Sequence, residues 1–147
     1  MGRKILAVIV AWIVAAAIML VGQMGMASFW PAPSPTVREN AAAMQAYIEN
    51  LPTEAFVTLA IIYAVASFAG GFIATKMGRR FSSGPTLALI VGVLLTLGGF
   101  YNFFVALPYH PGWVTLVCLL IYIPFALLGY KLAGGTVPAV DKEKAGV

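Results

Sequence analysis

Only a few side chains in the apolar parts of this sequence carry groups that could do chemistry. They are Gln23, Ser67, Thr96 and Asn102. All four are neutral and can donate or accept hydrogen bonds without holding a charge. In an apolar environment, such groups usually hold helices together and contribute about 0.6 kcal/mol each. They could also line a polar pathway, and we expect Gln23 and Asn102 near the same end of the molecule.

The sequence contains no recognisable catalytic or metal-binding set. His110 is the only histidine, and it lies in a proline-flanked turn, where we expect a surface residue. Cys118 is the only cysteine, so it can form neither an intrachain disulfide nor a cysteine-based metal site. There is no Ser-His-Asp set, no H-E-x-x-H motif and no glycine-rich phosphate loop. The sequence therefore predicts no enzyme activity and no cofactor.

Four apolar segments must position these side chains: residues 5–26, 55–77, 86–107 and 113–133. At about 1.5 Å per residue, each segment can cross the ~30 Å hydrocarbon core as a helix. Only 10% of the 147 residues are charged and 61% are hydrophobic, whereas a soluble domain carries about 25% charged residues. The sequence therefore predicts an all-α membrane protein, a four-transmembrane-helix bundle that forms one domain over residues 1–147.

The basic residues predict the orientation of these segments. If each segment crosses once, one side receives Arg3, Lys4, Lys76, Arg79, Arg80, Lys131, Lys142 and Lys144. The other side receives Arg38 alone. By the positive-inside rule, both termini are cytoplasmic (N-in, C-in). Membrane topology explains these charges, so we expect no nucleic-acid partner. The first segment exceeds the 7–15 residues typical of the apolar h-region of a signal peptide, and we expect it to remain as a span.

The outer loop, residues 28–53, is the one sizeable region outside the apolar segments. Thr36 begins an S/T-x-x-E capping box, and apolar residues then recur at steps of three or four. This pattern predicts a short amphipathic helix at about 37–50. The helix would lie on the membrane surface or cap the bundle, or it would dock a partner. The candidate partner surface consists of Trp30, Met44 and Ile48.

Small residues at four-residue steps mark where membrane helices approach closely. The second segment carries Ala66, Gly70 and Ala74, and the third carries Ala88 and Gly92. A short basic turn joins these two segments, which makes them neighbours in an antiparallel pair. The sequence therefore predicts tight packing between the second and third spans.

Pro124 lies midway along the fourth segment and predicts a kink there, because it removes a backbone donor and clashes with the preceding turn. Most such prolines only bend a helix, although broken helices mark binding sites in some transporters. Gln23, Asn102 and the Pro124 kink could together line a pathway. No ionisable group lies deep in the segments, which disfavours a self-contained ion-coupled pump.

Two resemblances bear on these predictions. Residues 71–80 resemble the G-x-x-x-D-R-x-G-R-R cytoplasmic loop motif of major facilitator transporters, with Thr75 in place of the family's Asp. The whole chain resembles a family of small four-transmembrane-helix bacterial inner-membrane proteins. That resemblance rests on the proline-rich outer loop, a G-G-x-x-A stretch at 70–74, Asn102, and the proline and glycine of the fourth segment. It implies a four-helix bundle and no particular activity. Members often carry an acidic residue late in the first helix, where this chain has Gln23.

The sequence thus favours a non-enzymatic accessory or interaction subunit of a membrane complex. It would meet itself or a larger membrane protein through its lipid-facing helices or its outer loop. The alternative is a small-solute or ion transporter or channel that functions as an oligomer.

Overall fold

The computed structural model describes residues 2–78 and 84–134, and the described chain is a bundle of long helices. The long elements are α1 (Gly2–Met26), α4 (Thr53–Gly78), α5 (Thr86–Tyr101) continued by the π-helix η1 (Asn102–Ala106), and α6 (Gly112–Leu132). These make four helices that are long and apolar enough to cross a membrane. The predicted helical class and the four long apolar helices are confirmed. Arg79, Arg80, Lys142 and Lys144, which contribute to the charge asymmetry, lie outside the described residues.

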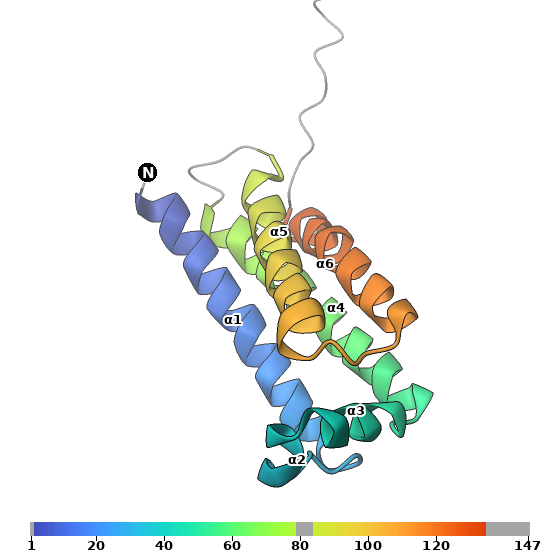
Figure 1. Ribbon diagram of the computed structural model, residues 1–147. Helices are drawn as coiled ribbons and strands as arrows, with labels where there is room; N and C mark the ends of the chain where they lie inside the picture. Colours follow the sequence, from blue (N-terminus) through green and yellow to red (C-terminus); the bar gives the residue numbers. More distant parts are fainter. Residues whose placement is uncertain (1, 79–83, 135–147) are drawn as a thin grey trace, which may run out of the picture.

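The four long helices alternate in direction, so the bundle has two distinct ends (Figure 1). The start of α1, the end of α4, the start of α5 and the end of α6 lie at one end. The short helices α2 (Pro35–Glu39) and α3 (Ala41–Glu49) lie at the other. Prolines at 52, 85 and 111 precede α4, α5 and α6, where a missing N–H costs nothing and the fixed φ favours a helical start. α6 continues through Pro124 from Gly112 to Leu132, and the kink remains a prediction.

The closest helix contact joins α4 to α6, whereas the sequence predicted α4 and α5 as the tight pair. A Cβ atom on Gly129 would lie 2.7 Å from the backbone nitrogen of Phe72, and one on Gly71 would overlap the backbone of Ala126. Gly92, predicted to face α4, faces α6 instead, because its Cβ would lie 3.1 Å from the Cα of Ile123. The small residues did indicate close approach, but spacing alone does not identify the helix that approaches.

The predicted contact between α4 and α5 does exist, in a looser form. A Cβ atom on Gly70 would lie 3.0 Å from the Val91 side chain of α5 and 3.3 Å from the Cβ of Ala15 on α1. Gly70 therefore sits where three helices meet. The other predicted packing residues, Ala66, Ala74 and Ala88, are fully buried.

The region predicted as one helix at 37–50 forms two helices that are separated at Asn40. Asn40 has extended φ and ψ angles of −109° and 113°, and its Oδ1 accepts from the backbone N–H groups of Ala42 and Ala43 at 3.0 and 3.1 Å. It is therefore the N-cap of α3. Ser34 is the N-cap of α2 and accepts from the N–H of Val37 at 3.4 Å. The predicted capping box at Thr36 is wrong, because Ser34 and Asn40 are stronger capping residues at the positions where the chain turns.

α3 packs against the end of the bundle through the side chains that were predicted to meet a partner. Met44 and Ile48 are only 8% and 2% exposed, and both belong to the hydrophobic core. The Tyr47 hydroxyl donates to the Pro31 carbonyl at 2.9 Å and fixes α3 to the preceding link. Met44 and Ile48 are thus unavailable to a partner in this arrangement. Trp30 keeps a partly exposed side chain.

Candidate functional site

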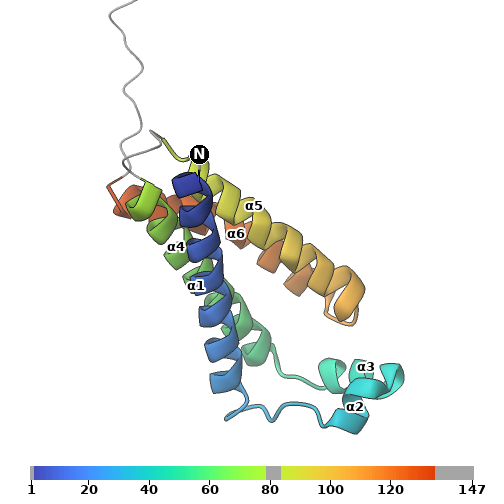
Figure 2. The ribbon, with the colours of Figure 1, turned by 90° about the vertical axis from the view of Figure 1, so that its left-hand side faces the viewer.

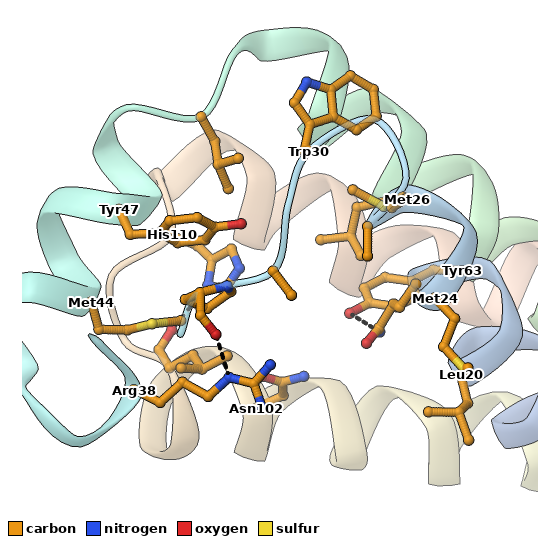
Figure 3. Close-up of a pocket in the computed structure, with 17 residues that line it drawn as sticks. Leu20, Met24, Met26, Trp30, Arg38, Met44, Tyr47, Tyr63, Asn102 and His110 are labelled. Atoms are coloured by element: carbon orange, nitrogen blue, oxygen red, sulfur yellow. Dashed lines mark hydrogen bonds between the residues drawn. The ribbon is translucent and has the colours of Figure 1, made fainter. Parts of the chain in front are cut away.

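A cavity of 630 Å³ lies beneath α2 and α3, between the link at residues 27–33, α1, α4 and η1 (Figure 3). Most of its wall is apolar and comes from leucine, methionine and proline side chains. Its polar lining residues are Gln23, Arg38, Tyr47, Tyr63, Asn102 and His110. The cavity brings together Gln23 and Asn102, two of the four polar residues predicted from the sequence. The other four polar lining residues were not predicted as site residues.

A narrower crevice of 140 Å³ runs from this cavity into the bundle between α1 and α5. Gln23, Tyr63 and Asn102 line both spaces and form the neck between them. Beyond the neck, the crevice is apolar. It is lined by Trp12, Ala16 and Met19 of α1, by Leu94, Leu95, Gly98 and Gly99 of α5, and by Tyr122 of α6. The two spaces share this polar neck, and most of the wall of each is apolar.

A hydrogen bond crosses the neck from α1 to α4. Nε2 of Gln23 donates to the hydroxyl of Tyr63 at 3.5 Å (Figure 3). The Tyr63 ring is buried between Phe103 and Tyr122, with ring centroids 6.3 and 5.7 Å away. A tyrosine in the middle of an apolar helix needs a partner for its hydroxyl, and this signal in the sequence could have identified Tyr63.

Asn102 is the most unusual residue of the neck. Its Oδ1 is buried and has no hydrogen-bond partner among the described residues. It also begins the π-helical turn, in which the backbone N–H of Leu107 donates to the Asn102 carbonyl at 2.8 Å. π-helical turns are rare and often occur at functional sites, and an unsatisfied buried polar atom costs about 1–3 kcal/mol. Asn102 thus combines a rare backbone turn with a buried amide oxygen that has no partner among the described residues.

His110 contributes to the chamber as a neutral side chain. Its ring packs against Phe103 and Phe56, with centroids 4.9 and 6.3 Å away, and Nδ1 lies 2.9 Å from the Leu107 carbonyl oxygen. A contact with a carbonyl oxygen requires the proton on Nδ1. Burial lowers the pKa of His110 below its usual 6.5, so the ring is uncharged at neutral pH. His110 lies in the expected turn, but it is only partly exposed because the Phe103 and Phe56 rings pack against it.

Arg38 supplies the only charge among the residues that line the chamber. Its Nε donates to the carbonyl of Pro33 at 3.0 Å, which holds the guanidinium beside the chamber (Figure 3). The nearby Tyr47 stays protonated, because burial raises its pKa more than the charge of Arg38 lowers it. The chamber therefore presents one positive charge and several neutral hydrogen-bonding groups.

The remaining predicted residues lie away from the two spaces. Ser67 is buried and donates to the Tyr122 carbonyl of α6, whereas Thr96 donates to the Gly92 carbonyl of its own helix at 2.8 Å. Both hydroxyl groups make structural hydrogen bonds to backbone carbonyls. Pro124 lies on the exposed side of α6 and lines neither space. Within residues 2–78 and 84–134, no three His, Cys, Asp or Glu side chains come together as metal ligands would.

The chain matches no protein-family model, and neither a curated protein nor a solved structure matches it. The geometry of the described residues is therefore the guide to function. That geometry suits binding, since the neck and chamber offer hydrogen bonds, one cation and a large apolar wall.

Proposed function

We propose that this protein is a non-enzymatic accessory or interaction subunit of the bacterial inner membrane, with both termini in the cytoplasm. It acts by packing its lipid-facing helices against a second copy or a larger membrane complex. The charge distribution supports the orientation. Arg3, Lys4, Lys76 and Lys131 belong to the bundle end that holds the N-terminus, and Arg38 belongs to the end with α2 and α3.

The observation that carries this proposal is an apolar groove of 530 Å³ between α1 and α4. It is lined entirely by small and aliphatic side chains, from residues 13–22 of α1 and 61–65 of α4. α1 is also the least covered span, since 17% of its most apolar stretch is buried, against 39% for α4. Membrane helices associate where small residues permit close approach. Ala17 is such a residue, exposed in this groove.

Filling the groove tests the proposal. Ala17→Trp would occupy the space that a partner helix needs, whereas Leu120→Trp adds the same side chain to an exposed position on α6. We expect native mass after mild extraction to show the wild-type chain and Leu120→Trp in a stoichiometric assembly, and Ala17→Trp largely alone. A wild-type chain that travels alone, or an assembly that tolerates Ala17→Trp, would overturn the proposal.

A pathway for small solutes or ions within an oligomer is the second candidate. It is favoured by the meeting of Gln23 and Asn102 in one cavity. Within one copy, however, the helices pack closely in the other half of the bundle, where the backbones of Gly71 and Ala126 are in contact. This contact opposes a path through a single copy. Flux into proteoliposomes distinguishes the two candidates. Robust transport by the purified protein alone would exclude the accessory role.

A further inference from the structure

The chamber holds a cation, and the crevice that shares its neck holds none. The chamber lies where α2 and α3 cover the ends of α1, α4 and η1, and it carries Arg38. The crevice lies between α1 and α5, which are long and apolar enough to cross a membrane, and most of its wall is apolar. α1 and α5 diverge toward the end with α2 and α3 (Figure 2).

We propose that this composite site binds one phospholipid, with its phosphate at Arg38, a headgroup donor at Asn102, and an acyl chain in the crevice between α1 and α5. This inference does not depend on the accessory role or on the groove between α1 and α4. It concerns a different face of α1, since the groove uses Val14, Ala17 and Val21 and the crevice uses Trp12, Ala16 and Met19.

Arg38 fits the phosphate. Its Nε is held by the Pro33 carbonyl, and the other N–H donors of a guanidinium suit two oxygens of one phosphate. Arg38 is an exposed side chain at the rim of the chamber, so a lipid headgroup can reach it without a change of fold. The partly exposed Trp30 on the same rim is the residue type that favours the headgroup layer of a membrane.

Asn102 restricts the headgroup further. Its Oδ1 is buried at the neck without a partner and can only accept a hydrogen bond. A ligand that satisfies it must bring an O–H or N–H group close to its phosphate. Phosphatidylglycerol offers hydroxyl groups and phosphatidylethanolamine offers an ammonium. Phosphatidylcholine carries a phosphate but no donor, and it serves as the matched negative probe.

The crevice has room for an apolar chain because α5 has a glycine, Gly98, in the crevice wall. A Cβ atom built on Gly98 would meet no atom within 4 Å, so this glycine leaves open space beside Trp12 and Ala16. A soluble phosphate compound would leave this crevice empty. A phospholipid fills both parts, and it surrounds a membrane-spanning bundle at high concentration.

The test is native mass spectrometry of the delipidated full chain with added phosphatidylglycerol, phosphatidylethanolamine or phosphatidylcholine that carry identical acyl chains. We expect the first two to bind roughly tenfold more tightly than phosphatidylcholine, because only they satisfy the buried amide oxygen. Arg38→Gln should weaken both by roughly tenfold. Lys4→Gln removes a cation at the opposite end and should change nothing.

Gly98→Leu tests the acyl chain. The new side chain enters open space, so the bundle should fold, and it should weaken binding of all three lipids. Gly25→Leu is the matched control, since Gly25 also meets nothing within 4 Å and lines neither space. Helix content by circular dichroism verifies the fold of each variant.

Four results would overturn the proposal. Equal binding of phosphatidylcholine and phosphatidylglycerol would rule out the role of Asn102. If Arg38→Gln binds lipid as tightly as Lys4→Gln does, Arg38 does not hold the phosphate. If Gly98→Leu binds lipid as tightly as Gly25→Leu does, the acyl chain does not occupy the crevice. Displacement of the lipid by millimolar inorganic phosphate would also contradict it, since the site would then recognise phosphate alone.

Discussion

The two ends of this bundle are built from different kinds of residue. At the end that holds the N-terminus, alanine and glycine bring helices into contact, through Ala7 and Ala11 of α1, Gly71 and Ala74 of α4, and Ala126 and Gly129 of α6. At the end with α2 and α3, the core contains four buried aromatic residues, Phe56, Tyr63, Phe103 and Tyr122, beside Met44, Ile48, Val114 and Cys118. The first end has its backbones in contact, and the second encloses a chamber and a crevice.

This difference teaches how a small membrane protein can combine stability with a binding space. Helices in lipid gain little from burying apolar side chains against each other, so close backbone packing supplies much of the association energy. The close-packed end can hold the bundle together. The aromatic end can then leave Asn102 unsatisfied and keep its space open. Substitutions at one end should therefore change the stability of the bundle, and substitutions at the other end should change the binding space.

The largest effect should come from the contact between α4 and α6. Gly129→Leu places side-chain atoms where Phe68 and Phe72 present their backbones, so the helices must separate. We expect a loss of more than about 3 kcal/mol in the free energy of unfolding, beyond the usual cost of overpacking. The thermal midpoint in detergent measures this. Gly2→Leu, which meets no neighbour at the same end, is the control. Equal midpoints for the two variants would show that the contact is not essential.

Gly92→Leu should disrupt the bundle less severely. Its Cβ would lie 3.1 Å from Ile123 Cα and 3.3 Å from Ala126 Cβ, distances that need small adjustments of α6. Overpacking of this kind costs about 1–3 kcal/mol. Thermal stability and oligomer size in detergent report the change. If both stay at wild-type values, the junction of α5 and α6 is looser than the structure indicates.

A substitution at the open end should act in the opposite direction. Asn102→Leu removes a buried amide oxygen that has no partner, so the lipid-depleted protein should gain about 1 kcal/mol of stability. Chemical unfolding before and after delipidation checks this. The gain in stability should shrink when phosphatidylglycerol is restored, because the lipid then donates a hydrogen bond to the Asn102 amide oxygen of the wild-type protein. A destabilised delipidated variant would mean that Asn102 is structural.

The smallest effect concerns pH. Burial lowers the pKa of His110 below its usual 6.5, so protons bind the unfolded chain more readily than the folded chain as the pH falls. Stability should be complete above pH 6.5 and decline below it. His110→Gln, which keeps a donor and cannot titrate in this range, should flatten the thermal midpoint between pH 7 and 5.5. Parallel curves for the two proteins would show that His110 does not couple to folding.

Hydropathy and helix length made the four spans predictable, because the bilayer sets the length of each element. The same sequence did not identify helix partners correctly. Gly92 and Gly70 belong to the expected small-residue pattern, yet Gly92 packs on α6 and Gly70 meets both α1 and α5. A spacing of four residues identifies a face of one helix, and the neighbour of that face depends on how all four helices cross.

The candidate site was predictable in part. Gln23 and Asn102 were selected as polar side chains in apolar segments, and they lie at the same neck. Their surroundings were not predictable from local patterns. Arg38 reaches the chamber because the chain breaks at Asn40, and His110 becomes partly buried because Phe103 and Phe56 cover it. The Phe56 contact joins distant parts of the sequence, whereas the break at Asn40 is a local feature that the predicted capping box missed.

The π-helical turn at Asn102–Ala106 has a consequence for how this chain tolerates length changes. A π-turn holds one residue more than an α-turn, so η1 behaves as a one-residue insertion in the third span. Deleting Phe104, which is exposed, turns the bond between the Leu107 N–H and the Asn102 carbonyl into an i→i+4 bond, so the helix should become regular while Leu107 keeps its place. The four long helices and the Leu107 and His110 wall of the chamber should survive. The wide turn thus lets the third long helix lose one residue without losing its register.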